Sequence, residues 1–200
     1  MSGCEAESPF IRAFVAVEVP LAVRRALVAR QAFLRKAETH VAWVPLTNLH
    51  LSLAFLGDIP SIMVEMLALA LDETAASNAP FVCVVKGLGT FGGSRAPRVV
   101  WAGLAPCPPL MRLQRELVGH LGGLGVDVES REYHPHITLG RIRSPRSADR
   151  LVKAADAARE DLLGEVPVES VALMRSRLCP AGAEYTLLHS AALRKASATA

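Results

Sequence analysis

Two short segments of the chain share one pattern: a histidine, an apolar residue, a hydroxyl residue and a leucine. They are residues 50–53, His-Leu-Ser-Leu, and residues 136–139, His-Ile-Thr-Leu. In a β-strand, residues two apart project from the same face, whereas on a helix they diverge by about 200°. If both segments are strands, the sequence presents two matched pairs of an imidazole and a hydroxyl, His50 with Ser52 and His136 with Thr138.

Such a set suits an anionic phosphodiester. The hydroxyls of Ser52 and Thr138 can donate hydrogen bonds to non-bridging oxygens. A neutral imidazole can take a proton from water, and an imidazolium can give one to the leaving oxygen. Histidine serves both roles because its unperturbed pKa is about 6.5. This chemistry requires no metal and no cofactor, so we expect neither.

Two simpler interpretations compete with this one. A single His-x-Thr in a strand is usually structural, and only the repetition of the motif makes it specific. His134 and His136 also form an His-x-His pair of the kind that binds zinc. Pro135 separates the two, no third ligand is visible nearby, and the pair does not recur at His50.

The elements around the motifs indicate the α+β class, because strands come in groups rather than in strict alternation with helices. Strands are expected at residues 11–19, 48–56, 81–87, 98–104, 133–141, 168–174 and 184–193, and helices at 21–36, 60–75, 110–121 and 148–163. Residues 89–97 are expected to form a Gly/Pro loop. We expect a single domain over residues 11–193, with two lobes around a cleft, and flexible ends at 1–10 and 194–200.

Composition excludes several classes of protein. Of the 200 residues, 51% are hydrophobic and the net charge is +3, so a disordered chain and tight binding to duplex nucleic acid are not expected. No apolar run is long enough for a membrane span, and the acidic start does not resemble a secretory signal. The four cysteines are scattered. We therefore expect a cytoplasmic protein with reduced thiols, a monomer without an obligate protein partner.

With these motifs the chain resembles the two-histidine (2H) phosphoesterases, in particular their bacterial and archaeal RNA 2',3'-cyclic phosphodiesterase branch, also called 2'-5' RNA ligase. The resemblance extends over residues 12–20, 43–57, 91–103, 134–141 and 168–186. It implies a bilobal fold with pseudo-twofold symmetry, in which two antiparallel sheets flank a central cleft and helices lie outside. It also implies metal-independent hydrolysis of a terminal 2',3'-cyclic phosphate of RNA to a 2'-phosphate, with weak 2'-5' ligation.

Carried over residue by residue, the resemblance makes His50 and His136 the catalytic pair, and Ser52 and Thr138 the phosphate ligands. It assigns His50 as general acid toward the 3' oxygen and His136 as general base toward water, although the sequence itself does not distinguish these roles. Position 52 is serine where the family usually has threonine. The hydroxyl is kept, so we expect a modest effect of the lost methyl.

The resemblance also places Phe55 and Arg141, each five residues after its histidine, on either side of the terminal nucleobase. This odd spacing would put them on the wrong strand face unless the strands bend near Gly57 and Gly140. The alternative for Phe55 is ordinary core packing. The loop arginines Arg95 and Arg98 are left outside the predicted site. Alternative functions are a phosphodiesterase for small cyclic nucleotides or 2'-5' oligonucleotides, and a non-catalytic RNA-binding module.

Overall fold

The computed structural model describes residues 9–37, 40–92, 96–128, 131–144, 148–180 and 182–194. Most of the expected N-terminal extension, nearly all of the expected tail and the loop residue Arg95 lie outside the described residues. The strands are β1 (Phe10–Glu18), β2 (Val41–Trp43), β3 (His50–Pro60), β4 (Phe81–Phe91), β5 (Val99–Leu104), β6 (His136–Ile142), β7 (Leu162–Val168), β8 (Ser170–Cys179) and β9 (Gly182–Ala192). The helices are α1 (Leu21–Leu34), α2 (Val64–Ala76), α3 (Pro108–Gly123) and α4 (Asp149–Ala157), with short 3-10 turns η1 (Leu46–Asn48) and η2 (Ser61–Met63).

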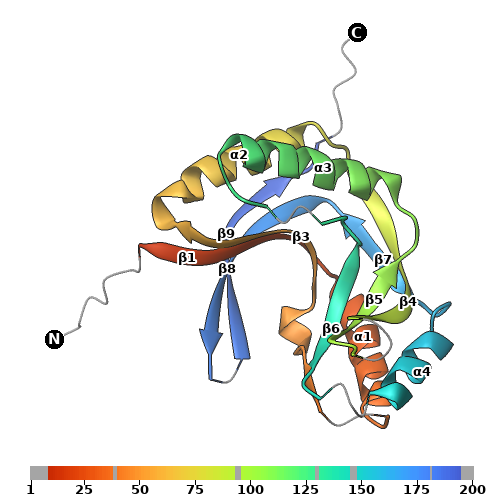
Figure 1. The fold of residues 1–200 in the computed structure, drawn as a ribbon. Coiled ribbons are helices and arrows are strands. Elements are labelled where there is room, and N and C mark those ends of the chain that lie inside the picture. The colour runs from red at the N-terminus through yellow and green to blue at the C-terminus, as the bar shows by residue number, and fades with distance from the viewer. Residues whose placement is uncertain are drawn as a thin grey trace.

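The strands form two antiparallel sheets (Figure 1). The first has the order β3-β1-β8-β9, and the second has the order β2-β6-β5-β4-β7. β1 is almost continuously apolar because it lies between β3 and β8, and its residues 13–17 are all buried. The predicted α+β class and the two antiparallel sheets are confirmed.

Each sheet is covered by two helices (Figure 1). Helices α2 and α3 pack on each other and against strands of the first sheet, whereas α1 and α4 pack against β7 and β4 of the second. The leucines of α3 at positions 110, 113, 117 and 121 are fully buried, which is the stripe expected of a helix lying on a sheet. Two of these helices are exchanged between the sheets. Helix α1 follows β1 of the first sheet but covers the second sheet, and α3 follows β5 of the second sheet but covers the first sheet.

The predicted helix over residues 148–163 is wrong in its second half. Helix α4 ends at Ala157, and residues from Leu162 form strand β7, which pairs with β4. Gly164 has φ +126°, which no helix accommodates. Leu163 and Val166 of β7 are buried, and β7 packs against α1. The alanine-rich pattern of α4 extended the predicted helix into residues that in fact form an edge strand with a local kink.

Other boundaries differ less. β4 continues to Phe91, so the loop begins three residues later than expected. The expected strand at 168–174 is divided, since Val168 ends β7 and β8 begins at Ser170. None of the helices in the described ranges has the length and hydropathy needed to cross a bilayer.

Candidate active site

His50 and His136 are the first residues of β3 and β6, which belong to different sheets and pack beside each other. Leu51 and Ile137, which follow the histidines, are fully buried, whereas Ser52 and Thr138 are half-buried. The alternation expected from the two motifs is therefore present in both strands. The two imidazoles are close enough that the charge on His136 contributes to lowering the pKa of His50.

Both histidines are held in the same way by the backbone just before the strand. The Nδ1 atom of His50 lies 2.7 Å from the carbonyl oxygen of Asn48, and Nδ1 of His136 lies 2.7 Å from the carbonyl oxygen of His134. A carbonyl oxygen only accepts hydrogen bonds, so each Nδ1 must carry the proton and donate it. In each ring Nε2 is left to accept a proton when the ring is neutral, or to donate one when the ring is charged.

Aromatic side chains surround both imidazoles. The ring of Phe14 lies 4.8 Å from that of His50, and Tyr185 meets His50 edge-on at 5.3 Å. Phe91 meets His136 edge-on at 4.9 Å. Burial lowers the pKa of both histidines, against the opposing effect of the carbonyl bonds. The surroundings therefore favour the neutral imidazole until an anion is bound.

A β-bulge in β3 resolves the spacing problem of Phe55. Ala54 pairs with Val15 of β1 and Ser52 pairs with Ala16, so Leu53 is an extra residue without a partner. The bulge reverses the alternation, and Phe55 stands on the same side of the strand as His50. Its ring is 6.2 Å from Phe14, the residue that contacts His50. Phe55 is 50% exposed, so its interpretation as a core residue is wrong.

A second bulge stands at the matching position in β6. Gly140 pairs with Val100 of β5 and Thr138 pairs with Trp101, which leaves Leu139 unpaired. Arg141 is thereby turned to the side of His136, where its charge adds to the effect of burial in lowering the pKa of His136. Burial raises the pKa of Tyr185, and the charge of Arg141 opposes that rise. Both extra residues, Leu53 and Leu139, lie three positions after their histidine.

The bend is produced by the bulges and not by the glycines expected to supply it. In β3 the position that matches Gly140 is Ala54, and the strand bulges there all the same. Gly140 is needed for another reason: a Cβ on it would lie 2.6 Å from Cγ1 of Val41 in β2. Gly57, with φ +68°, lies beyond a further register shift at the far end of β3.

A buried glutamine of α1 supports the second bulge. Nε2 of Gln31 donates to the carbonyl oxygens of Leu139 and Val44, both at 2.8 Å, and Gln31 is only 3% exposed. The backbone N–H of Val44 also donates to Leu139, at 2.9 Å. The carbonyl of the bulged residue is thus fully satisfied inside the protein.

Gln31→Leu is expected to destabilise the protein by about 1–3 kcal/mol. Leucine keeps the volume but leaves the Val44 carbonyl without a donor and the Leu139 carbonyl with one donor fewer. The free energy of unfolding in urea measures the effect. Phe33→Leu, at a half-exposed position of the same helix, is the matched control. An unchanged midpoint in Gln31→Leu would show that these carbonyls do not depend on the amide.

The hydroxyls of Ser52 and Thr138 are free for a ligand. Within the described residues, neither Oγ of Ser52 nor Oγ1 of Thr138 has a hydrogen-bond partner. The backbone oxygen of Ser52 is instead held by the Tyr133 hydroxyl, which donates to it at 2.9 Å. Each motif thus presents an unengaged hydroxyl two residues after an oriented imidazole.

The zinc interpretation of His134 and His136 finds no support in the described part of the chain. The side chain of His134 is 64% exposed, and it lies 3.9 Å from the carboxylate of Glu132. Among the described residues, no group of three histidine, cysteine or acidic side chains is arranged to hold a metal ion. What His134 contributes to His136 is its backbone carbonyl.

Comparison with known proteins decides the family. A family model described as the 2'-5' RNA ligase superfamily matches residues 19–178. The chain belongs to this superfamily. A relative from Methanothermobacter thermautotrophicus, named RNA 2',3'-cyclic phosphodiesterase, is 34% identical over 88% of this chain and 95% of its own. A relative of the same name from Thermus thermophilus is 35% identical over 92% and 91%.

Solved structures agree with this membership of the 2'-5' RNA ligase superfamily. A crystal structure of a Thermus thermophilus protein has a TM-score of 0.79 at 33% identity, covering 92% of this chain and 98% of its own. The E. coli protein LigT in complex with 3'-AMP has a TM-score of 0.73 at 27% identity, covering 93% and 99%.

Several residues around the site of this superfamily member were not predicted. Phe14, Phe91 and Tyr185 pack on the imidazoles of His50 and His136, and Gln31 supports a bulge. Phe91 falls in the segment expected to be a loop. The burial of Gln31 could have been predicted, because Gln31 continues the stripe of buried residues that Val23 and Leu27 form along α1.

Proposed function

We propose that this protein hydrolyses the 2',3'-cyclic phosphate at the 3' end of RNA to a 2'-phosphate, using His50 and His136 as acid and base. The observation that carries the proposal is the pair of matched motifs, each with Nδ1 bonded to a carbonyl and a free hydroxyl two residues on. Relatives covering most of the chain are named RNA 2',3'-cyclic phosphodiesterases, which supports this substrate.

In the proposed reaction, water attacks phosphorus while Nε2 of His136 takes its proton. The bond from phosphorus to O3' breaks, and Nε2–H of His50 gives its proton to O3'. The remaining product is a 2'-phosphomonoester. The Nδ1 bonds to Asn48 and His134 are kept throughout, because each Nδ1 carries a hydrogen in both protonation states.

The other predicted residues bind and orient the substrate. Ser52 and Thr138 donate hydrogen bonds to the non-bridging oxygens. Phe55 and Arg141 lie on the same strand faces as the histidines and hold the terminal base between an aromatic ring and a guanidinium plane. All six residues come from one chain, so we propose that the protein acts as a monomer. We also propose that it acts on RNA ends in the cytoplasm and that residues 11–193 form its single domain.

The test is hydrolysis of an oligonucleotide ending in a 2',3'-cyclic phosphate, in excess EDTA, with 2'- and 3'-phosphate products resolved by chromatography. We expect a 2'-phosphate product and a rate that EDTA leaves unchanged. A parallel panel contains a 2',3'-cyclic mononucleotide and a 2'-5' linked dinucleotide. Exclusive turnover of the dinucleotide, or a 3'-phosphate product, would contradict the proposal.

The pH dependence of kcat/KM is expected to be bell-shaped with its maximum below pH 6.5. Activity falls in acid as the base becomes protonated, and falls in alkali as the acid loses its proton. Because burial lowers both histidine pKa values from 6.5, both limbs of the kcat/KM profile have their midpoints below pH 6.5 in the free enzyme. A bound anion raises both pKa values, so the maximum of kcat moves to higher pH. A kcat/KM maximum well above pH 6.5 would contradict this assignment.

A further inference from the structure

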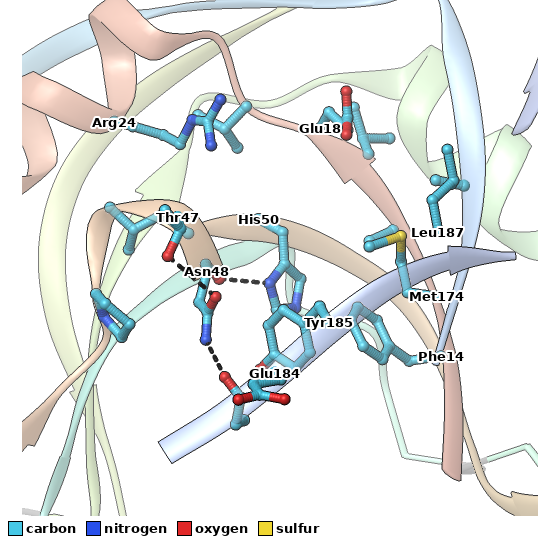
Figure 2. A pocket seen from close by; sticks show the side chains of 17 residues that line it. Phe14, Glu18, Arg24, Thr47, Asn48, His50, Met174, Glu184, Tyr185 and Leu187 are labelled. Carbon is cyan, nitrogen blue, oxygen red and sulfur yellow. Dashed lines mark hydrogen bonds between the residues drawn. The ribbon is translucent and has the colours of Figure 1, made fainter. Parts of the chain in front are cut away.

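A pocket adjoins His50 and the segment that precedes it in the chain. It has a volume of about 540 Å³, which lies within the range of ligand-binding pockets. Figure 2 shows Arg24, Thr47 and Asn48 around this space, together with His50, which packs beside Tyr185 and Phe14. We call it the Arg24 pocket. Its walls come from the end of β1, the first turn of α1, turn η1 and strands β8 and β9.

Arg24 brings to this pocket a positive charge that no described residue pairs. Its Nε atom is buried and makes no hydrogen bond, and Arg24 forms no ion pair with any described residue. Arg30, nearly two turns further along α1, is by contrast paired with Asp161 at 2.9 Å. An unpaired arginine in a pocket that His50 also lines can bind an anion.

The other polar side chains of the Arg24 pocket are already engaged or lie at its rim. Asn48 Nδ2 donates to the Ala183 carbonyl at 2.6 Å, and Thr47 Oγ1 donates to Asn48 Oδ1 at 3.3 Å. Glu184 is paired with Arg177 at 3.1 Å. Glu18 is exposed and lies apart from Arg24 in Figure 2. Among the described residues, the pocket is therefore left with one unpaired cation, the half-buried Arg24, and one unpaired, exposed carboxylate, that of Glu18.

The proposed acid and base roles fix which part of the substrate reaches this pocket. In an in-line displacement the entering water and the leaving O3' lie on opposite sides of phosphorus. Water stands at His136, which has its own neighbouring pocket, and O3' stands at His50. The ribose that carries O3', and the strand that continues from its 5' carbon, then lie on the side of the Arg24 pocket.

We propose that the Arg24 pocket binds the RNA phosphodiester on the 5' side of the terminal nucleotide, with the Arg24 guanidinium as its ligand. The inference rests on the proposed function and deepens it. The protein is then built for the end of an RNA chain rather than for a mononucleotide, which has no phosphodiester to offer to Arg24.

The experiment compares two substrates in steady-state kinetics, a 2',3'-cyclic mononucleotide and a trinucleotide ending in a 2',3'-cyclic phosphate. Arg24→Met keeps the apolar stem and removes the charge. It is expected to lower kcat/KM for the trinucleotide about tenfold or more, mainly through KM, since a charged hydrogen bond is lost. The mononucleotide should be turned over as by the parent protein. Arg24→Lys should restore part of the loss.

Arg25→Ala is the matched control, because Arg25 is exposed on the next position of α1 and does not line the pocket. Equal losses on both substrates, or no loss on either, would overturn the inference while leaving the proposed function intact. If the parent protein turns over neither substrate, the proposed function fails. Calorimetric binding of a trinucleotide 2'-phosphate and of a nucleoside 2'-phosphate then tests Arg24 separately, and equal affinities of Arg24→Met and parent protein for the trinucleotide would overturn it.

Discussion

His136→Ala and His50→Ala are each expected to lower turnover of a cyclic-phosphate-ended oligonucleotide by about 10²-fold or more. Each change removes the Nε2 atom that is proposed to move a proton, while the strand is kept by its backbone pairing with β5 or β1. Single-turnover rates with saturating enzyme measure the chemical step without interference from weak binding. The double variant is expected to be little worse than either single one, because the two histidines act as a unit.

His134→Ala is the control for this experiment. Its imidazole is exposed and adjoins the site, but its contribution to His136 is a backbone carbonyl that alanine also has. We expect near-parental turnover. A loss as large as that of His136→Ala would point to a role for the His134 side chain. Near-parental turnover in both His50→Ala and His136→Ala would refute the two-histidine mechanism.

Thr138→Val is expected to lower kcat by about 10²-fold, with a smaller effect on KM. Valine has the shape of threonine without its hydroxyl, so a donor to the phosphate is lost without a cavity. The charge on the phosphoryl oxygens is redistributed as the P–O3' bond breaks, so a fixed donor there favours the transition state. Measurement of kcat and KM over a range of oligonucleotide concentrations separates the two effects.

Ser52 offers a comparison within the same site. Ser52→Ala should resemble Thr138→Val, whereas Ser52→Thr and Thr138→Ser keep the hydroxyl and should turn over substrate almost as the parent protein does. Folding is checked by the midpoint of thermal unfolding, which should not move, because both side chains are half-buried and have no hydrogen-bond partner among the described residues. Unchanged kinetics in both hydroxyl-free variants would remove these residues from the phosphate site.

The two motif strands could be predicted because their signal is local. His50 and Ser52 alternate with Leu51 and Leu53, and that pattern alone determines which side chains share a face. The bulges could not be predicted in this way. Leu53 and Leu139 are extra residues only relative to β1 and β5, so their effect on Phe55 and Arg141 depends on pairing with distant strands.

The aromatic residues around the histidines could not be predicted for the same reason. Tyr185 lies more than half of the chain after His50, and the residues next to it in the sequence do not indicate that it contacts His50. Strand β7 was missed because an alanine-rich helix precedes it and its two-residue pattern is interrupted at Gly164. Sequence patterns thus predicted most of the helices and strands, but not β7, and tertiary pairing determined how the segments complete the site.

The exchange of helices between the sheets has a consequence for folding. Helix α1 covers the sheet that holds His136, and α3 covers the sheet that holds His50. Neither sheet has its apolar face fully covered until the exchanged helix has joined α2 or α4 on it. A half-folded species with one imidazole in place would expose the leucine stripe of α3 or the buried face of α1 to water. We therefore expect the two imidazoles to be assembled and lost in one cooperative step, with no stable fragment that keeps one of them in place.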